Sequence, residues 1–576
     1  MDSAIATRKT LYKGAQIAIK TLEHLGVDTC FAYPGGSAVE FHQALADSSI
    51  RVILPRNEQG GAFAANGYAR ASGKVGVCMA TSGPGATNLL TGIADAYMDS
   101  IPVVIITGQV ESWYIGKNAF QEIDIIGMTR PIVKHSFLVL DPSEIAPTII
   151  RAFAIAQSGR PGPVWIDIPK DIQKAMLEFH VPPAPPSGNM PWTEGMPEED
   201  VLAVKQEIAR ARRPCIYAGG GIISAGAEKE LLAFAEGYNI PVATSLMGIG
   251  AFPETHPLSL KFFGMHGTYY ANYAVNESDL LLVLGARFSD RSTGAVADFA
   301  PNARIVHIDI DASEINKNVQ AHIGIRADIK PALAHLNRNP EFRERSGWFE
   351  TIANWKAEHP LHYTASPGGL KPQQVVEAID RATGGGAIIV PGVGQHQMWA
   401  AQYYRYRRPR QLLTSGGLGT MGFGLPAAIG AKLARPDELV INIDGDGSFQ
   451  MNIQELGTVA AEEIGIKMVI LNNQHLGMVA QIEDLFYRGK RGNTDLRGKC
   501  ARPFPDFVNI ARSYDIPGRD VFRPEELENA ITEMLGTPGP FLLDCHTLYQ
   551  DHVLPMIPGG KSYREMILEC PSEKQP

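Results

Sequence analysis

The sequence has no continuous apolar run long enough to cross a bilayer, and only 6 of its 576 residues are cysteine. Positive charge is not in excess, because 52 Lys and Arg stand against 61 Asp and Glu, for a formal net charge of -9. These features argue against a membrane span, a disulfide scaffold and a general attraction to nucleic acid. The cysteines form no CxxC pair and lack metal-ligand spacing, so we expect free, mostly structural thiols: Cys30, Cys78, Cys215, Cys500, Cys545 and Cys570.

The length of the chain exceeds what one hydrophobic core supports, so we expect three domains. Repeated strand, glycine loop and helix patterns predict an α/β fold with three doubly wound parallel-sheet domains. A Pro-rich stretch at 181–186 and a Pro-Gly stretch at 366–369 mark the linkers. We therefore predict domains over 8–180, 190–345 and 370–576. The N-terminal stretch has neither a signal core nor a long transit peptide, so we expect a cytoplasmic protein.

The strongest local pattern is a strand, a helix and a second strand. An apolar run at 440–443 leads to Asp446 between two glycines, a helical pattern follows from about 453 to 463, and a run at 468–471 ends before Asn473. Because both strands of a βαβ unit run the same way, the two polar side chains reach one edge of the sheet. Their oxygens suit Mg²⁺ that holds a phosphate. Alternatively, the glycines make only a tight turn and the Asn pair only ends a strand.

The spacing adds specificity, because Gly-Asp-Gly is followed by 24 residues and then Asn-Asn, which resembles the thiamine diphosphate fingerprint. The stretches NEQGGAFAANGYAR, TSGPGATN and GIADAYMDSIPVVIITGQV resemble the pyrimidine-binding domain of acetolactate (acetohydroxyacid) synthase catalytic subunits. The resemblance covers about 14 to 566 in the domain order of that family. It implies three cofactors, thiamine diphosphate, Mg²⁺ and FAD, and the substrates pyruvate and 2-ketobutyrate, in the first common step of branched-chain amino acid biosynthesis.

The resemblance also implies a thiamine diphosphate site that is completed in a homodimer or homotetramer. Glu58 would hydrogen-bond N1′ of the aminopyrimidine, with an ion pair to Arg56 as the alternative role; Met421 would lie between the two rings or simply fill the core. Mg²⁺ would be held by Asp446, Asn473 and the carbonyl of His475. The other residues implied at this cofactor are Tyr33, Pro34, Gly35, Thr81, Pro84, Asn88, Gln121, Val393, Gly394, Gln395, His396, Gly419, Gly445, Gly447, Ser448, Leu476, Gly477 and Met478.

The middle of the chain contains CIYAGGGII, which alone is a weak dinucleotide signal, because many turns look the same. Together with SLMG, MHG, GARF and HIDID it resembles the FAD domain of the family. The residues implied for FAD are Gly219, Gly220, Gly221, Thr244, Leu246, Met247, Met265, His266, Gly285, Arg287, Asp290, Arg291, Asp309 and Asp328.

The substrate residues are also taken from the resemblance. Arg291 matches the arginine that binds the acceptor carboxylate, with an ion pair to Asp290 as the alternative. Lys170 matches a channel residue, although an isolated lysine is more often solvated surface. The implied catalytic residues are Glu58, Gly36, Gln121, Lys170 and Arg291, and the implied substrate-binding residues are Phe120, Met478 and Ile482.

Two positions depart from the family pattern. Ile482 stands where biosynthetic members carry Trp, so we expect no strong preference between the two acceptors and weaker binding of planar herbicides. Ser289 replaces an aspartate, which would loosen a flavin or arginine contact. A basic stretch at 488–499 is either a solvated loop or a lid over the diphosphate. Feedback inhibition, a small regulatory subunit and tetramer formation stay open.

Three rival functions remain at this point. A flavin-coupled pyruvate oxidase would share the domain plan and both organic cofactors. An FAD-free catabolic acetolactate synthase is disfavoured by Arg287 and the SLMG and HIDID stretches. A non-catalytic assembly protein is disfavoured by intact Glu58, Asp446 and Asn473.

Overall fold

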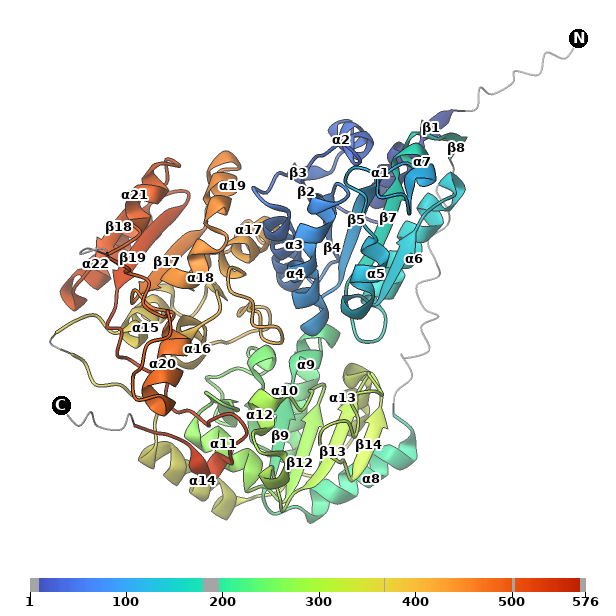
Figure 1. Ribbon diagram of the computed structural model, residues 1–576. Coiled ribbons are helices and arrows are strands. Elements are labelled where there is room, and N and C mark those ends of the chain that lie inside the picture. The colour runs from blue at the N-terminus through green and yellow to red at the C-terminus, as the bar shows by residue number, and fades with distance from the viewer. Residues whose placement is uncertain (1–9, 180–195, 367, 500–502, 570–576) are drawn as a thin grey trace, which may run out of the picture.

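The computed structural model describes residues 10–179, 196–366, 368–499 and 503–569. These residues form three α/β domains, each built around a parallel sheet with helices on its faces (Figure 1). The predicted fold class is confirmed. Within these ranges no helix is long and apolar enough to cross a membrane. The first predicted linker, 181–186, lies outside the described residues, as does residue 367 of the second.

The first domain has the strand order β3-β2-β4-β5-β7-β6. Its strands are β2 (Thr29–Ala32), β3 (Arg51–Ile53), β4 (Gly76–Ala80), β5 (Val103–Gln109), β6 (His135–Leu138) and β7 (Val164–Pro169). Its helices are α1 (Gly14–His24), α2 (Val39–Ala46), α3 (Glu58–Ser72), α4 (Pro84–Met98), α5 (Ile125–Thr129), α6 (Ile145–Gln157) and α7 (Lys170–Lys174). A short antiparallel pair, β1 (Leu11–Lys13) and β8 (Met176–Glu178), closes it.

The central domain has the strand order β11-β10-β9-β12-β13-β14. Its strands are β9 (Pro214–Ala218), β10 (Val242–Thr244), β11 (Ser259–Phe262), β12 (Leu280–Leu284), β13 (Arg304–Asp309) and β14 (Ile323–Arg326). Its helices are α8 (Glu198–Arg210), α9 (Gly220–Ala225), α10 (Glu228–Tyr238), α11 (Tyr269–Asn276), α12 (Asp290–Thr293), α13 (Ile329–Leu336) and α14 (Ser346–Glu358).

The third domain has the strand order β15-β16-β17-β19-β18. Its strands are β15 (Ile388–Pro391), β16 (Val440–Gly445), β17 (Lys467–Asn472), β18 (Gly518–Val521) and β19 (Phe541–His546). Its helices are α15 (Pro372–Thr383), α16 (Gln395–Tyr403), α17 (Gly424–Ala434), α18 (Asp446–Gln450), α19 (Leu456–Ala461), α20 (Gly477–Phe486), α21 (Phe507–Arg512) and α22 (Pro524–Gly536).

The helix expected at about 453–463 is shorter than predicted. A 3-10 turn, Ile453–Glu455, precedes α19, and α18 comes before both. The chain turns at Asn452, whose side-chain amide donates to the carbonyl of Gly422 at 2.8 Å. The two flanking strands match their predictions, and β16 is buried along its whole length, as expected for a central strand of a covered parallel sheet.

Helices α3 and α17 join the first domain to the third. The rings of Phe63 and Phe423 pack edge to face with centroids 5.7 Å apart, inside one apolar cluster that contains side chains of both domains. The helices approach closely at two glycines: a Cβ on Gly67 would lie 2.1 Å from the Ala427 carbonyl oxygen, and one on Gly430 would lie 1.9 Å from that of Ala64. The two domains that carry the predicted thiamine diphosphate residues therefore share a core within one chain.

Candidate active site

The carboxyl edge of the third sheet carries the residues predicted to bind Mg²⁺. Strands β16 and β17 pair in parallel with Gly445 opposite Leu471, so Asp446 and Asn473 follow their strands at the same edge. Asp446 is 2% exposed, and its Oδ2 atom has no hydrogen-bond partner among the described residues. Burial raises the pKa of Asp446 to about 7, while backbone hydrogen bonds from Gly447 and Gln474 act in the opposite direction. A buried carboxylate oxygen without a partner is costly, and a divalent cation would satisfy it.

The other predicted metal ligands lie in a tight turn after β17. The side-chain oxygen of Asn473 accepts a 3.0 Å hydrogen bond from the backbone N–H of His475, and its amide donates to Gln395 at 3.3 Å. The His475 ring stacks on Tyr549 with centroids 4.7 Å apart. A carboxylate, an amide oxygen and a backbone carbonyl form the all-oxygen donor set that Mg²⁺ prefers. The residues present therefore fit this cation.

The predicted diphosphate contacts lie where β15, β16 and β17 lead into α16, α18 and α20. Helix N-termini carry unpaired N–H groups and bind anions. Glycine is needed here: a Cβ on Gly445 would lie 2.6 Å from Nδ1 of His396, and one on Gly477 would lie 2.1 Å from Oε1 of Gln395. The Ser448 hydroxyl accepts from the backbone N–H of Gly422 at 3.1 Å and ties the neighbouring loop to α18.

The predicted pyrimidine contacts gather in the first domain. Glu58 is the first residue of α3 and half-buried, and Asn88 of α4 donates to its Oε2 at 2.9 Å. A Cβ on Gly85 would lie 3.2 Å from Oε1 of Glu58, so this glycine keeps α4 close to the carboxylate. Thr81 accepts from the backbone N–H of Ser37 at 3.1 Å, which joins the loop after β4 to the loop after β2, where Tyr33, Pro34, Gly35 and Gly36 lie.

The predicted substrate residues are less closely grouped. Gln121 has a left-handed φ of 60°, and a Cβ on Gly83 would lie 2.8 Å from its carbonyl oxygen, so these two loops touch. Phe120 is 88% exposed. Lys170 begins α7 and is partly buried. Arg291 forms the ion pair with Asp290 that was the alternative interpretation, at 2.8 Å, with both side chains largely exposed.

A cavity of about 1820 Å³ lies between the domains. Twelve of the fourteen residues predicted for FAD line it, and Gly219 and Thr244 do not. Gly219 instead packs against the next strand, where a Cβ would lie 2.1 Å from the carbonyl oxygen of Gly285. From the third domain, Gly419 and three residues of α20 also line the cavity: Met478, Ile482 and Phe486. Their spacing of four residues places them on one face of the helix.

Polar residues that hold the first and third domains together were not predicted from the sequence. Glu455 is 1% exposed and accepts from the backbone N–H groups of Arg56 and Asn57. Burial raises the pKa of Glu455, against the opposing hydrogen bond from Thr458. A second buried group consists of Arg70, Asp95 and Asp99. The sequence signal that could have indicated these buried residues is an acidic residue inside an apolar run, as in NIQELGTV and GIADAYMDS.

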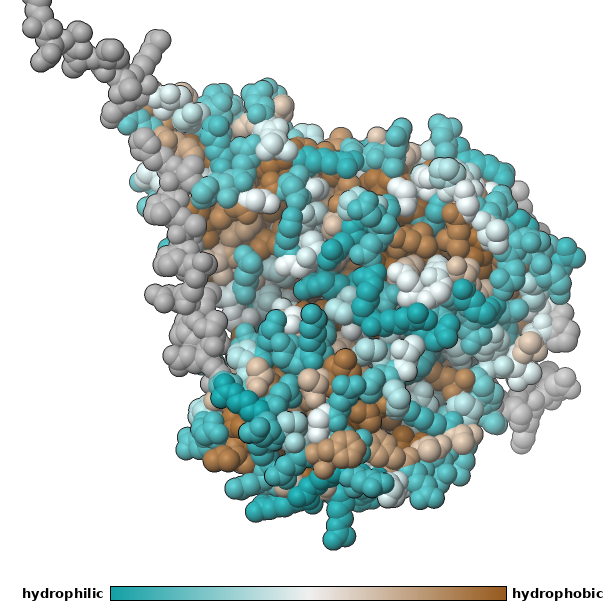
Figure 2. All heavy atoms as spheres, turned by 180° about the vertical axis from the view of Figure 1, so that it is seen from behind, coloured by the Kyte–Doolittle hydropathy of each residue, from teal (hydrophilic) through white to brown (hydrophobic). Residues whose placement is uncertain are grey.

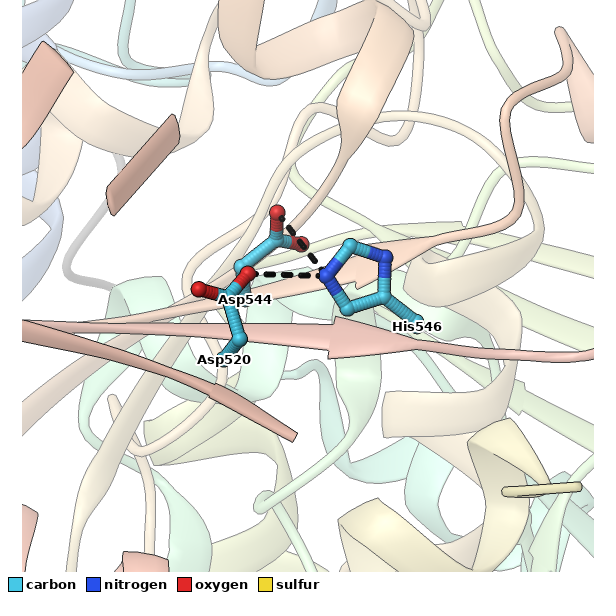
Figure 3. A group of neighbouring side chains, drawn as sticks. All are labelled: Asp520, Asp544 and His546. Atoms are coloured by element: carbon cyan, nitrogen blue, oxygen red, sulfur yellow. Dashed lines mark hydrogen bonds and ion pairs between the residues drawn. The ribbon is translucent and has the colours of Figure 1, made fainter. Parts of the chain in front are cut away.

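A further polar group lies on strands β18 and β19 of the third sheet (Figure 3). Nε2 of His546 lies 2.9 Å from Asp520 and 3.6 Å from Asp544 and points between the two carboxylates. The His546 ring also stacks on Phe522 with centroids 4.1 Å apart. Asn472, next to the predicted metal ligand, donates to Asp544 at 3.1 Å. These contacts join β18 and β19 to the turn after β17.

The basic stretch after α20 is partly neutralised. Arg491 lies 2.6 Å from Asp484, and Arg497 forms a two-pronged contact with Asp495. Arg488, Lys490 and Lys499 are exposed. Ser289, at the departure from the family pattern, lies 3.3 Å from Ser292 through their hydroxyls.

The described cysteines Cys30, Cys78, Cys215 and Cys545 are buried and free, whereas Cys500 and Cys570 lie outside the described residues.

The fold and these two half-sites define a thiamine diphosphate-dependent enzyme, and comparison with known families agrees. The N-terminal TPP binding domain of thiamine pyrophosphate enzymes matches residues 12–128, the central domain 201–336 and the C-terminal TPP binding domain 392–545. Thiamine pyrophosphate is another name for thiamine diphosphate.

Individual relatives narrow the family. The chain is 51% identical to "Acetolactate synthase 1, chloroplastic" of Nicotiana tabacum, over 97% of this chain and 85% of the relative. It is 52% identical to "Acetolactate synthase 1, chloroplastic" of Oryza sativa subsp. japonica, over 97% and 88%, and 49% identical to "Acetolactate synthase, chloroplastic" of Arabidopsis thaliana, over 97% and 84%. The chain belongs to the acetolactate synthase family.

Proposed function

We propose that this protein decarboxylates pyruvate and transfers the remaining two-carbon hydroxyethyl unit to a second 2-ketoacid. With pyruvate as acceptor the product is 2-acetolactate, and with 2-ketobutyrate it is 2-aceto-2-hydroxybutyrate. The observation that carries the proposal is the pair of half-sites, Glu58 with Asn88 in the first domain and Asp446 with Asn473 in the third, in a chain about half identical to acetolactate synthases.

Thiamine diphosphate supplies the carbanion-stabilising chemistry that decarboxylation requires. Glu58 would share a proton with N1′ of its aminopyrimidine ring, and the Asn88 amide, 2.9 Å from one carboxyl oxygen, fixes the direction in which that carboxyl faces. Asp446, Asn473 and the carbonyl of His475 would hold Mg²⁺, which would supply positive charge for the diphosphate. The buried and unpartnered Oδ2 of Asp446 supports this assignment.

The acceptor binds between Arg291 and α20. Arg291 lines the cavity and, apart from its bond to Asp290, has guanidinium donors left for a carboxylate. Ile482 lies on the same cavity wall and is 38% exposed. Its aliphatic side chain leaves more room than an indole, so this chain distinguishes the two acceptors weakly.

FAD occupies the large cavity and has no net redox role in this reaction. The support is the lining: Gly220, Gly221 and Gly285, together with Arg287, Asp309 and Asp328, surround a space large enough for a dinucleotide. A purified protein that releases a yellow flavin on denaturation would agree with this assignment and count against an FAD-free enzyme.

A homodimer is the smallest active unit. Glu58 and Asp446 must reach opposite ends of one cofactor, and several large apolar side chains near the substrate residues are exposed, among them Phe120 at 88% and Trp113 at 57%. Figure 2 shows apolar surface over the upper part of the molecule, where the first and third domains lie. Mixing Glu58→Ala chains with Asp446→Ala chains tests this arrangement, because activity returns only when a site takes its two halves from different chains.

The function itself is tested by supplying the purified protein with pyruvate, thiamine diphosphate, Mg²⁺ and FAD, with and without 2-ketobutyrate. Acid conversion of the products to acetoin and its homologue reveals carboligation. We expect both products, and Glu58→Ala abolishes them. Consumption of pyruvate with release of acetate and reduction of the flavin would instead identify a pyruvate oxidase.

A further inference from the structure

Glu455 is a buried acidic side chain in the third domain that contacts the turn directly before Glu58. It ends the 3-10 turn Ile453–Glu455 and is 1% exposed. Its Oε1 accepts from the backbone N–H of Arg56 at 3.0 Å and from that of Asn57 at 3.1 Å. Its Oε2 accepts from the Thr458 hydroxyl at 2.7 Å and lies 3.2 Å from the same Arg56 N–H.

The two backbone groups that Glu455 binds directly precede Glu58. They belong to the turn between β3 and α3, and among the described residues the printed acceptor of both N–H groups is the Glu455 carboxylate. Asn57 also caps α3, because its side chain accepts from the backbone N–H of Gln59 at 2.8 Å. The direction of the first turn of α3, and with it the starting point of the Glu58 side chain, therefore depends on one carboxylate from another domain.

The surrounding residues leave space for this carboxylate and for little else. A Cβ on Gly60 would lie 2.3 Å from Oε1 of Glu455, so glycine is required one turn into α3. The Arg56 guanidinium turns away and donates to the carbonyls of Leu54 and Gly457 at 2.8 and 3.0 Å. The Glu455 carboxylate thus accepts hydrogen bonds from backbone N–H groups and a hydroxyl. A buried charge stabilises a core poorly, because removing it from water is costly. This favours a geometric role for Glu455.

We propose that Glu455 is a positioning residue for Glu58: by holding the N–H groups of Arg56 and Asn57 it sets where the Glu58 carboxyl meets the aminopyrimidine ring. The inference rests on the role of Glu58 in the proposed function. Within one chain, Asp446 forms one end of a cofactor site. Glu455, nine residues later, aligns Glu58 of the same chain.

The test uses the full-length protein and compares Glu455→Ala with Glu455→Gln. The amide keeps an oxygen that accepts from both backbone N–H groups, and its NH₂ group faces a Thr458 hydroxyl that can turn to accept. Glu462→Ala is the matched control, because Glu462 also links the third domain to the first, through Arg51 at 3.1 Å, without touching the turn before Glu58.

The first readout needs no cofactor. Amide hydrogen exchange of the protein alone should accelerate at Arg56 and Asn57 in Glu455→Ala and stay near wild type in Glu455→Gln and Glu462→Ala. The second is the exchange of the C2 proton of bound thiamine diphosphate in deuterated water. We expect it to slow about 10- to 100-fold in Glu455→Ala, with recovery in Glu455→Gln, because a displacement near 1 Å has that effect on a reacting group.

The outcomes test the positioning role of Glu455 separately from the proposed function. Unchanged C2 exchange in Glu455→Ala, with only a lower melting temperature, would overturn the positioning role. If Glu455→Ala does not fold, Glu455→Asp gives the same decision, since its carboxylate stays buried but is one methylene too short to reach both N–H groups. C2 exchange requires no pyruvate, so a wild-type protein that exchanges C2 but forms no acetolactate would refute the proposed function and leave the role of Glu455 standing.

Discussion

Asp99 of the first domain accepts a 2.7 Å hydrogen bond from the backbone N–H of Gly417 in the third domain. Its other oxygen accepts from Gly416 at 3.0 Å and from Arg70 at 2.7 Å. The side chains of Asp99 and Arg70 are almost completely buried. The loop so held leads to Gly419, which lines the large cavity. The C-terminal end of α4 therefore supports a cofactor loop, while its N-terminal end carries Asn88.

Replacing Asp99 should destabilise the protein strongly. In Asp99→Ala, Arg70 loses its closest carboxylate while remaining buried, and Gly416 and Gly417 lose their acceptors. Breaking a buried ion pair in this way costs about 3 to 5 kcal/mol of free energy of unfolding. Urea unfolding measures this loss. The control is Glu528→Ala, which removes the exposed pair with Arg381 and should cost less than about 1 kcal/mol. Equal losses in the two variants would contradict the argument.

Ile482→Trp should shift the choice of acceptor toward 2-ketobutyrate. The indole would fill space on the cavity wall that the isoleucine leaves open, and the extra methyl of 2-ketobutyrate gains contact with it. A contact of this size changes the ratio of the two products about 10-fold or more. A competition assay with both acceptors measures the ratio.

The matched control for this change is Val479→Trp. Val479 lies on α20, is 48% exposed and, unlike Ile482, is not among the residues that line the cavity. The ratio should stay at the wild-type value there. If both variants changed it alike, the size of the added ring rather than its place on the cavity wall would be responsible.

The sequence could place Asp446 and Asn473 at one edge of the third sheet because that placement depends on local pattern. Parallel strands end at a common edge, so the spacing of Asp446 and Asn473 was enough to expect them together. Many of the residues implied for FAD by resemblance also line one cavity. The prediction of a helix at 453–463 was wrong in its boundaries, because the turn at Asn452 depends on a contact with Gly422, 30 residues away.

The residues that couple the domains could not be predicted in the same way. Glu455 and Arg56 are 399 residues apart in the chain, and Asp99 and Gly417 are 318 apart. No periodicity connects such pairs, because their contact arises only when α3 packs on α17. An isolated acidic residue in an apolar run indicates that some partner exists, but the partner is set by tertiary packing.

Asp446→Asn should weaken the binding of Mg²⁺. The amide keeps the shape of the side chain but replaces one anionic oxygen with an NH₂ group that cannot bind a cation. Loss of a supporting hydrogen bond around a metal costs about 10- to 100-fold in affinity, and loss of a ligand should cost at least as much. After removal of metal with EDTA, a Mg²⁺ titration followed by thiamine diphosphate binding measures the change. Asp437→Asn, at an exposed loop position, is the control and should leave the titration unchanged.

Asp167 should make stability depend on pH. It is fully buried on β7, three residues before Lys170, and accepts from Thr107 at 2.7 Å and from Gln109 at 2.9 Å. Burial raises the pKa of Asp167 from 3.8 to about 7, and the two hydrogen bonds oppose this rise. The folded state thus holds the proton more tightly than the unfolded chain. The contribution to stability is complete below about pH 4 and is lost as the pH rises toward about 7.

Asp167→Asn cannot titrate, so the difference in stability between wild type and variant should fall across this pH range, by an amount on the order of 4 kcal/mol at most. Urea unfolding at intervals from pH 4 to 8 measures both curves, and Asp437→Asn, which should run parallel to wild type, is again the control. Parallel curves for wild type and Asp167→Asn would mean that Asp167 is charged throughout the range. Strand β7, which ends directly before Lys170, would then contain a buried Asp167 carboxylate stabilised by hydrogen bonds from Thr107 and Gln109.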